Sequence, residues 1–414
     1  MQQGEFATAA PVEQSERIAE LDVLRGFALL GVLIANFDGF AGGGMMATGA
    51  QLAALSTVPI DHIADFLVEW LVLNKANTLF ATLFGLGFYI QISRNGDRPG
   101  FVRRYSRRLF WLLVFGWLNL TLLWVWDILN VYAVTGFLLL AVRRWSTRSL
   151  VMVGFVLAML SSSVMEVLAE AAGITLMDWN PYSDAAVLER QAASIAGDYG
   201  ALNALFWRYT WTEWFACGMF FFWIAYAGGR FMLGAAIGRS GIVDKITDNL
   251  ALLRRIRNIA LPLGLLVAFA LTALNQWDDQ LLGETGVTIA DVLASPSALL
   301  LAAGYACMIA VAWNTASGRS LLGLLKPVGQ MALTNYLAQG LLYALVMFGV
   351  GPGLALAGKV GSAQVLAICM AFFAFQALYS RWWLARFRFG PMEWLWRWLT
   401  YGGSAPAMRR VAPA

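Results

Sequence analysis

Ten apolar segments, separated by polar stretches, constrain this chain more than any other feature of its sequence. A helix needs about 20 mostly apolar residues to cross the ~30 Å hydrocarbon core of a bilayer. The chain is 59% hydrophobic and 13% charged, whereas soluble domains are about 25% charged. We therefore predict an all-α, polytopic integral membrane protein with about ten transmembrane helices. The segments lie at about residues 21–40, 64–93, 108–125, 128–142, 149–171, 211–236, 258–274, 293–313, 327–349 and 362–380.

The basic residues fall in alternate loops, and this pattern predicts how the helices are oriented. Cytoplasmic loops of membrane proteins carry an excess of Lys and Arg. Residues 173–207 and 273–297 are acidic instead. Both termini are therefore predicted to be cytoplasmic, with an even number of spans. The arginine clusters lie at residues 94–108, 143–148, 254–257 and 381–397.

Three regions follow from this reading of the chain. Residues 1–17 are predicted to be a cytoplasmic tail and residues 18–380 the transmembrane bundle. Residues 381–414 interleave Trp, Phe and Arg, which is typical of a segment that lies in the headgroup region. Residues 185–196, in the first acidic loop, are predicted to form an amphipathic surface helix.

Cysteine, histidine and charge exclude several classes of function. Cys217, Cys307 and Cys369 stand in apolar segments without a CxxC pair, and His62 is the single histidine, so no metal site is predicted. The net charge of +4 comes from the arginine-rich loops. It therefore indicates topology and contact with anionic membrane lipids, and no nucleic acid is expected as a partner.

The first apolar segment carries polar groups at both ends. Asp22 and Arg25 stand near its start, and Asn36 and Asp38 near its end. A charge within a span costs at least ~2.5 kcal/mol on insertion scales unless it has a partner or lines a polar cavity. Asp22 and Arg25 fit either a headgroup position or a cavity. For Asn36 and Asp38 a polar cavity is the better interpretation.

Counting about 1.5 Å per residue from the basic loops gives the depth of each polar residue. Six of them share one outer depth, and His62 lies just above them. They either line one cavity or are separate interfacial residues. We favour a shared cavity because Lys75 and Asp127 both need neutralising partners where water is scarce. The six residues are Asn36, Asp38, Lys75, Asp127, Asn130 and Glu213.

A second polar spot lies near the middle of the ninth apolar segment. Asn335, Tyr336 and Gln339 stand about half-way through the predicted span. Such residues either form interhelical hydrogen bonds, which are common in membrane bundles, or line a ligand channel.

Several stretches, in order along nearly the whole chain, resemble the YeiB-like family (domain of unknown function 418). Among them are Leu21-Asp-Val-Leu-Arg-Gly-Phe-Ala-Leu-Leu-Gly31 and Asp127-Ile-Leu-Asn-Val-Tyr-Ala133. Others are Pro327-Val-Gly-Gln-Met-Ala-Leu-Thr-Asn-Tyr336 and Phe387-Arg-Phe-Gly-Pro-Met-Glu-Trp-Leu-Trp-Arg397. The resemblance implies a multi-pass protein of the bacterial cytoplasmic (inner) membrane.

The first half also resembles the wider group of membrane-bound acyltransferases that includes heparan-alpha-glucosaminide N-acetyltransferase. The motif that carries this resemblance is Asp22-x-x-Arg25-Gly26 followed by Asn36. It implies a cytosolic acyl-CoA or acetyl-CoA donor, an acceptor on the far side, and an Asn and a His near the outer face. Asn36 matches by position, and His62 stands in the corresponding loop but closer to the next span than in that group; Asn119 stands where members of the group often have a His.

We therefore expect an acyltransferase that moves an acyl group to a small-molecule or lipid/glycan acceptor. Acyl transfer needs a base and a donor to the developing oxyanion. His62 is the predicted base, either the Asn36 amide or Lys75 the oxyanion donor, and Asp127 a residue that orients the base or acceptor. The predicted substrate-binding residues are Asp38, Lys75, Asn130, Glu213 and Arg25. The alternatives are a transporter or lipid flippase and a non-catalytic scaffold, and each could form a homodimer.

Overall fold

The computed structural model describes residues 18–39, 45–56, 58–96, 99–123, 125–277, 283–402 and 405–409. Every regular element in these residues is a helix, apart from one isolated bridge between Phe387 and Arg409. The predicted all-α fold is therefore confirmed. The predicted tail at residues 1–17 lies outside the described residues.

The helices follow one another with short connections. In chain order they are α1 (Ala19–Phe37), α2 (Gly49–Leu55), α3 (Pro59–Leu71), α4 (Lys75–Asn95), α5 (Phe101–Leu122), α6 (Leu129–Ala141), α7 (Thr147–Met159), α8 (Ser161–Ala171), α9 (Asp184–Ile195), α10 (Tyr199–Tyr209), the π-helix η3 (Thr210–Ala216), α11 (Met219–Arg239), α12 (Leu250–Trp277), α13 (Gly283–Trp313), α14 (Ala316–Leu322), α15 (Leu325–Gln330), α16 (Ala332–Met347), α17 (Ser362–Arg386) and α18 (Pro391–Tyr401).

Within the described residues, five helical segments are long and apolar enough to cross a membrane, or six if the bent pair α7–α8 is one span. These segments indicate a membrane protein, but the ten predicted spans are not all of this kind. The five segments are Pro59–Asn95, Met219–Arg239, Leu250–Gln276, Leu293–Trp313 and Ser362–Arg386.

Charge and length explain why other predicted spans are not among the helices long and apolar enough to cross a membrane. The 19-residue helix α1 carries Glu20, Asp22 and Arg25, and the 22-residue helix α5 begins with four arginines between residues 103 and 108. Helix α6 has 13 residues and α16 has 16. At 1.5 Å per residue they extend only ~20 and ~24 Å, less than the ~30 Å core.

Several predicted spans are interrupted by breaks in the helix, which a hydropathy profile does not detect. Helices α7 and α8 are bent by 99° relative to each other. Gly218, with φ 78°, separates η3 from α11, and Met331 separates α15 from α16. The amphipathic helix predicted at residues 185–196 is confirmed as α9.

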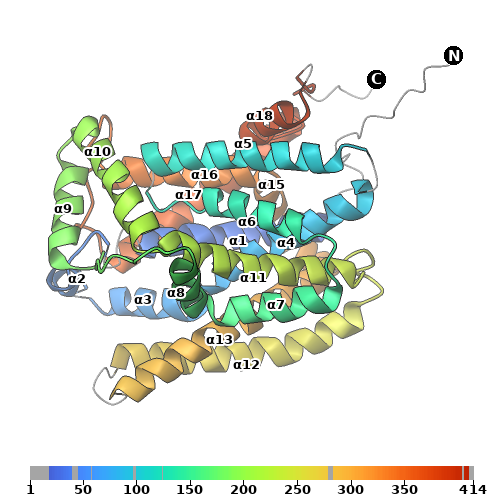
Figure 1. Ribbon diagram of the computed structural model, residues 1–414, viewed down its shortest axis with the longest axis horizontal. Helices are drawn as coiled ribbons and strands as arrows, with labels where there is room; N and C mark the ends of the chain where they lie inside the picture. The colour runs from blue at the N-terminus through green and yellow to red at the C-terminus, as the bar shows by residue number, and fades with distance from the viewer. Residues whose placement is uncertain are drawn as a thin grey trace.

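Most helices run along one common direction, with α9 and α10 at one end of the bundle (Figure 1). Helix α2 joins this end because the side-chain amides of Gln51 and Gln191 are hydrogen-bonded, with a nitrogen–oxygen distance of 3.1 Å. The chain turns from α4 into α5 at the opposite end (Figure 1). We call the two ends the cap end and the basic end, because the arginines of α5 lie at the latter.

Two glycines allow helices α4 and α11 to pack with their backbones in contact. An ideal Cβ added to Gly85 of α4 would lie 2.0 Å from the carbonyl oxygen of Phe231 in α11. The same addition to Gly234 of α11 would lie 2.0 Å from the carbonyl oxygen of Thr82. Small residues let membrane helices approach in this way, so α4 and α11 form a close central pair.

The orientation of the bundle can be tested with reporter fusions. We expect a reporter fused after Gly283, at the start of α13, and one fused after Gly96, at the end of α4, to report opposite sides of the membrane. The reason is that the loop before Gly283 is acidic and the one after Gly96 is basic. The measurement is a paired phosphatase and fluorescent-protein assay, and two reporters on the same side would reject this topology.

Candidate functional site

A cavity of about 290 Å³ opens at the basic end of the bundle. Its floor, between the helices, contains the buried side chains of Tyr132 and Tyr336. The cavity is also lined by arginines from four different helices, all half-buried or exposed, so its surface is strongly basic. We call it the basic cavity. Its four arginines are Arg25, Arg94, Arg108 and Arg397.

The Asp22-x-x-Arg25-Gly26 motif forms one wall of the basic cavity. Arg25 Nη1 lies 2.9 Å from Asp22 Oδ1, and Gln330 Nε2 donates to Asp22 Oδ2 over 3.0 Å. A Cβ on Gly26 would lie 2.1 Å from the carbonyl oxygen of Leu325, so only glycine lets α1 contact α15 here. The motif therefore holds a buried carboxylate and directs an arginine toward the cavity.

Helix α18 covers another part of the basic cavity. The Glu393 carboxylate accepts the backbone N–H groups of Leu333 and Thr334, over 2.6 and 3.1 Å, at the start of α16. The Arg108 guanidinium lies 3.6 Å from the centre of the Trp396 ring. A carboxylate at a helix N-terminus and a cation on an indole face are both favourable, so α18 is fixed to α16 and α5.

Asp127 is fully buried in the loop between α5 and α6, so it is not a freely solvated acid. Its Oδ1 accepts hydrogen bonds from Asn119 Nδ2 over 3.0 Å and from the hydroxyl of Tyr336 over 2.9 Å. Its Oδ2 accepts the N–H of Leu129 over 3.0 Å. Burial raises the pKa of the Asp127 carboxyl to about 7, and these hydrogen bonds limit the rise.

A small void of about 10 Å³ lies beside this cluster, between α1, α5 and α16. Asn119 Oδ1 and Gln339 Oε1 are buried and have no hydrogen-bond partner among the described residues. Their orientation is fixed, because Asn119 Nδ2 donates to Asp127, and Gln339 Nε2 to the carbonyl of Leu29 and to Gln376 Oε1. A polar space of this size can hold one water-sized group that donates hydrogen bonds. We call it the amide void; it is lined by Leu33, Asn36, Phe37, Asn119, Tyr336, Gln339 and Gly340.

Tyr336 lines both the basic cavity and the amide void. Its side chain is therefore the divider between a basic opening on one side and two unpartnered amide oxygens on the other. Because its hydroxyl is bonded to Asp127, the carboxylate is one hydrogen bond away from both spaces. This arrangement could bring an anionic ligand and a hydrogen-bond donor together at Tyr336 and Asp127.

The structure brings only some of the predicted site residues together. Asn36 lines the amide void, and Asp127 contacts two other side chains of its lining, Asn119 and Tyr336. Asn130, in the next turn after Asp127, is also buried, and its Nδ2 has no partner among the described residues. Arg25 lies at the other end, in the basic cavity.

Three other predicted residues lie outside both spaces. Lys75 is buried, and its Nζ donates to the carbonyl oxygen of Glu69 over 2.7 Å. A carbonyl in the last turn of α3 is a favourable partner for an ammonium. Asp38 lies close enough to Glu69 for their charges to repel. His62 is exposed on α3 and lines neither space.

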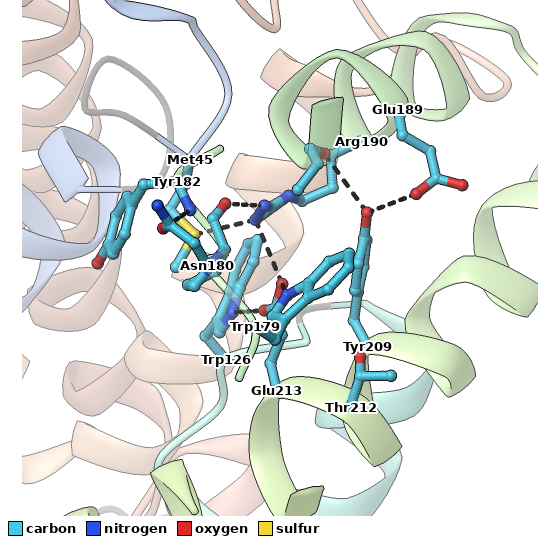
Figure 2. A network of polar contacts seen from close by, with 12 residues as sticks. Met45, Trp126, Trp179, Asn180, Tyr182, Glu189, Arg190, Tyr209, Thr212 and Glu213 are labelled. Atoms are coloured by element: carbon cyan, nitrogen blue, oxygen red, sulfur yellow. Dashed lines mark hydrogen bonds and ion pairs between the residues drawn. The ribbon is translucent and has the colours of Figure 1, made fainter. Parts of the chain in front are cut away.

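Glu213, predicted to bind substrate, instead belongs to a network at the cap end (Figure 2). Its carboxylate pairs with Arg190 of α9 and accepts the indole N–H groups of Trp126 and Trp179. It does not line either space. Through Trp126, however, it contacts the residue next to Asp127.

The second polar spot predicted from the sequence forms interhelical hydrogen bonds. Asn335 Nδ2 donates to Ser380 Oγ over 3.0 Å, and Gln376 Nε2 donates to the carbonyl of Asn335 over 2.8 Å. These contacts join α16 to α17. Of this spot, only Tyr336 and Gln339 reach the candidate site.

Sequence reasoning missed the role of Asn119 and Tyr336 beside Asp127. Asn119 precedes Asp127 by eight residues across the turn of a helical hairpin, and this could have suggested contact. Tyr336 is 209 residues from Asp127, and no sequence signal links them. Arg190 could have been noticed as the one basic residue of the acidic loop 173–207.

In the described residues, no group of three or more His, Cys, Asp or Glu side chains could hold a metal ion. Amides, a carboxylate and a phenol form the centre of the site, and the arginines lie in the basic cavity. These are groups that bind and orient organic ligands.

Comparisons with known proteins place the chain in context. Residues 237–403 match the family described as "Protein of unknown function (DUF418)". The chain is 28% identical to "Uncharacterized protein YxaH" of Bacillus subtilis, over 98% of this chain and 100% of that protein. It is 29% identical to "Uncharacterized protein YeiB" of Escherichia coli, over 96% and 100%. No solved structure matches. The resemblance to the YeiB-like family is thereby confirmed, and the more distant one to acyltransferases stays a prediction.

Proposed function

We propose a function for the site formed by the basic cavity, Tyr336 and Asp127 in this chain, which carries a DUF418 domain and is homologous to YeiB and YxaH along nearly its whole length. The proposal is an integral acyltransferase of the bacterial inner membrane. It moves an acyl group from a cytosolic thioester donor to a hydroxyl or amine at the far side. The observation that carries it is the basic cavity, whose floor is the phenol bonded to Asp127.

The basic cavity suits a donor with an anionic head and a slender thioester arm. Guanidinium groups bind phosphates through strong, charge-assisted hydrogen bonds, and the cavity has four arginines. Aromatic and aliphatic side chains, such as Phe80, Phe84 and Leu112, line its depth. An acyl-CoA such as acetyl-CoA would place its phosphates at the arginines and its acyl group near Tyr336.

The chemistry is assigned to Asp127 with its hydrogen-bonded neighbours. The acceptor oxygen or nitrogen bonds to the carbonyl carbon of the thioester, and Asp127 takes its proton. The carbon–sulfur bond then breaks, and the same proton passes to the departing thiolate, so the products are an acylated acceptor and a free thiol. The Tyr336 hydroxyl is the proposed donor to the developing oxyanion, because its proton is released from Asp127 once that carboxyl has taken the proton of the acceptor.

The alternative of a transporter or flippase would need a polar path through the bundle. Asn335, a residue that such a path would use, is instead saturated by contacts between α16 and α17. Tyr336 and its bond to Asp127 separate the basic cavity from the amide void. These observations favour the enzyme.

The donor part of the proposal is tested by binding of radiolabelled acetyl-CoA to the purified protein. We expect the double variant Arg25→Met, Arg397→Met to bind at least ~10-fold more weakly, because hydrogen bonds to charged groups contribute about 1.5–3 kcal/mol each. The matched control is Arg148→Met, an exposed arginine of α7 outside the cavity. Equal affinity in all three proteins would reject this donor site. Accumulation of a substrate in proteoliposomes without thioester consumption would favour the transporter.

A further inference from the structure

A buried ion pair joins α9 to η3 at the cap end (Figure 2). Arg190 and Glu213 are 2% and 3% exposed, with Nη1 and Oε1 3.6 Å apart. Arg190 also donates to Met45 Sδ over 3.0 Å and to the carbonyl of Pro181. Its guanidinium lies 5.4 Å from the centre of the Trp126 ring. We call Arg190, Glu213 and Trp126 the cap clamp.

Burying two charges gives little stability, because desolvation offsets most of their attraction. A buried ion pair is better explained by a role in holding a neighbouring side chain in one position. Here the fixed group is the Trp126 indole, whose N–H donates to Glu213 Oε2 over 2.8 Å while its ring packs beside Arg190. The other carboxylate oxygen, Glu213 Oε1, accepts the indole N–H of Trp179 over 3.4 Å.

Trp126 and Asp127 are consecutive residues, and the hydrogen bonds of their side chains fix this short segment from two directions. The Trp126 side chain is bonded toward the cap end, and the Asp127 side chain toward Asn119 and Tyr336. The loop has no other regular structure, since α5 ends at Leu122 and α6 begins at Leu129. Releasing the indole from Glu213 would remove the hydrogen bond that holds this segment from the cap end.

We infer that Glu213 is a positioning residue for Asp127, acting through the indole of Trp126, and that Arg190 holds the Glu213 carboxylate in place. This inference rests on the proposed function only for the role of Asp127. The structural link between the cap and Asp127 can be tested without any substrate.

Dicyclohexylcarbodiimide provides such a test, because this apolar reagent modifies carboxyl groups in their protonated form. We would measure the adduct at Asp127 in the full-length protein as a function of pH, by mass spectrometry of its peptides. Labelling of the wild type should fall with a midpoint near pH 7, where the buried carboxyl loses its proton. Tyr336 is the titratable side chain bonded to Asp127, and its pKa is raised well above its ordinary value, so it does not titrate in this range.

Two matched double variants separate the hydrogen bond from the ion pair. Glu213→Gln with Arg190→Met removes both charges but keeps an oxygen that accepts the indole N–H, so the midpoint should stay as in the wild type. Glu213→Leu with Arg190→Met removes that oxygen. Water that enters the loosened loop relieves the desolvation of Asp127, so the midpoint should fall by at least ~1 pH unit.

Trp126→Phe gives a third measurement in which Glu213 and Arg190 remain paired. This substitution removes the indole N–H and should shift the midpoint in the same direction as the Glu213→Leu, Arg190→Met double variant. The test therefore stays decisive even if the double variant fails to fold. The control is Arg208→Met, which breaks the exposed pair of Arg208 with Glu189 on the surface of the same cap. That control should leave the midpoint unchanged.

Two results would overturn the inference. One is a wild-type midpoint in Trp126→Phe; the other is an equal shift in the Gln and Leu double variants. A shift as expected, together with full transfer activity in a variant lacking the Asp127 carboxyl, would keep the structural link and reject the proposed function instead.

Discussion

Replacing Asp127 by Asn should lower the rate of acyl transfer by ~10²–10⁴, the usual contribution of a positioned base. The amide has the shape of the carboxyl, and its oxygen can still accept the hydrogen bonds from Asn119 and Tyr336, so only the acceptor for the Leu129 N–H is lost. The fold should therefore persist, which a size-exclusion profile and a melting curve of the purified protein would check. The rate is measured as release of free thiol from acetyl-CoA in the presence of total membrane lipid as acceptor.

The role of Asp127 as base also predicts how the rate of acyl transfer by the wild-type protein depends on pH. With a pKa of about 7, Asp127 is protonated below neutral pH and cannot accept a proton. The rate should therefore rise with pH and level off above about pH 8, roughly one unit beyond this pKa, where the carboxylate predominates. A rate that falls over this range would contradict the role of Asp127 as base.

His62→Ala is the matched comparison for Asp127→Asn. The sequence predicts His62 as the base because it is the single histidine. The structure leaves it exposed on α3, away from the basic cavity and the amide void. We expect its removal to leave the rate unchanged, and a loss as large as that of Asp127→Asn would return the chemistry to the outer surface above α3.

Counting residues from the basic loops gives an expected depth along the membrane axis and says nothing of lateral position. The counting placed Asp127 and Lys75 where water is scarce, and both side chains are buried in the structure. Because the counting gives only the position along the membrane axis, it grouped Lys75 with Asn36. In the structure Lys75 bonds to the end of α3, whereas Asn36 of α1 lines the amide void. Which residues share a depth follows from helix geometry, but which ones touch depends on how the helices pack.

The basic cavity was missed for a related reason. Its arginines belong to four segments that the positive-inside rule already explains. Nothing in their spacing indicates that α1, α4, α5 and α18 surround a common space. Two glycines let α1 and α15 approach at one wall of this cavity. Gly26 has a sequence signal, the motif Asp22-x-x-Arg25-Gly26, but its partner Gly329 lies in a distant segment.

Replacing Gly329 by Ala should prevent the bundle from closing at the basic end. A Cβ at this position would lie 1.8 Å from the carbonyl oxygen of Asp22 and 2.8 Å from the backbone nitrogen of Gly26. Neither atom can rotate away as a flexible side chain could. Overpacking against side chains costs ~1–3 kcal/mol, and a backbone contact of this kind should cost more, because α1 and α15 must separate.

The separation would also affect the candidate site directly. Asp22 would move away from Gln330, and the wall of the basic cavity that holds Arg25 would lose its support. We therefore expect little folded protein after purification of Gly329→Ala, seen as loss of the monodisperse peak in size exclusion and a lowered Tm. Gly49→Ala, with nothing within 4 Å of its added Cβ, is the control and should behave as the wild type. Equal melting temperatures for the two variants would mean that α1 and α15 are less closely packed than their backbone contacts indicate.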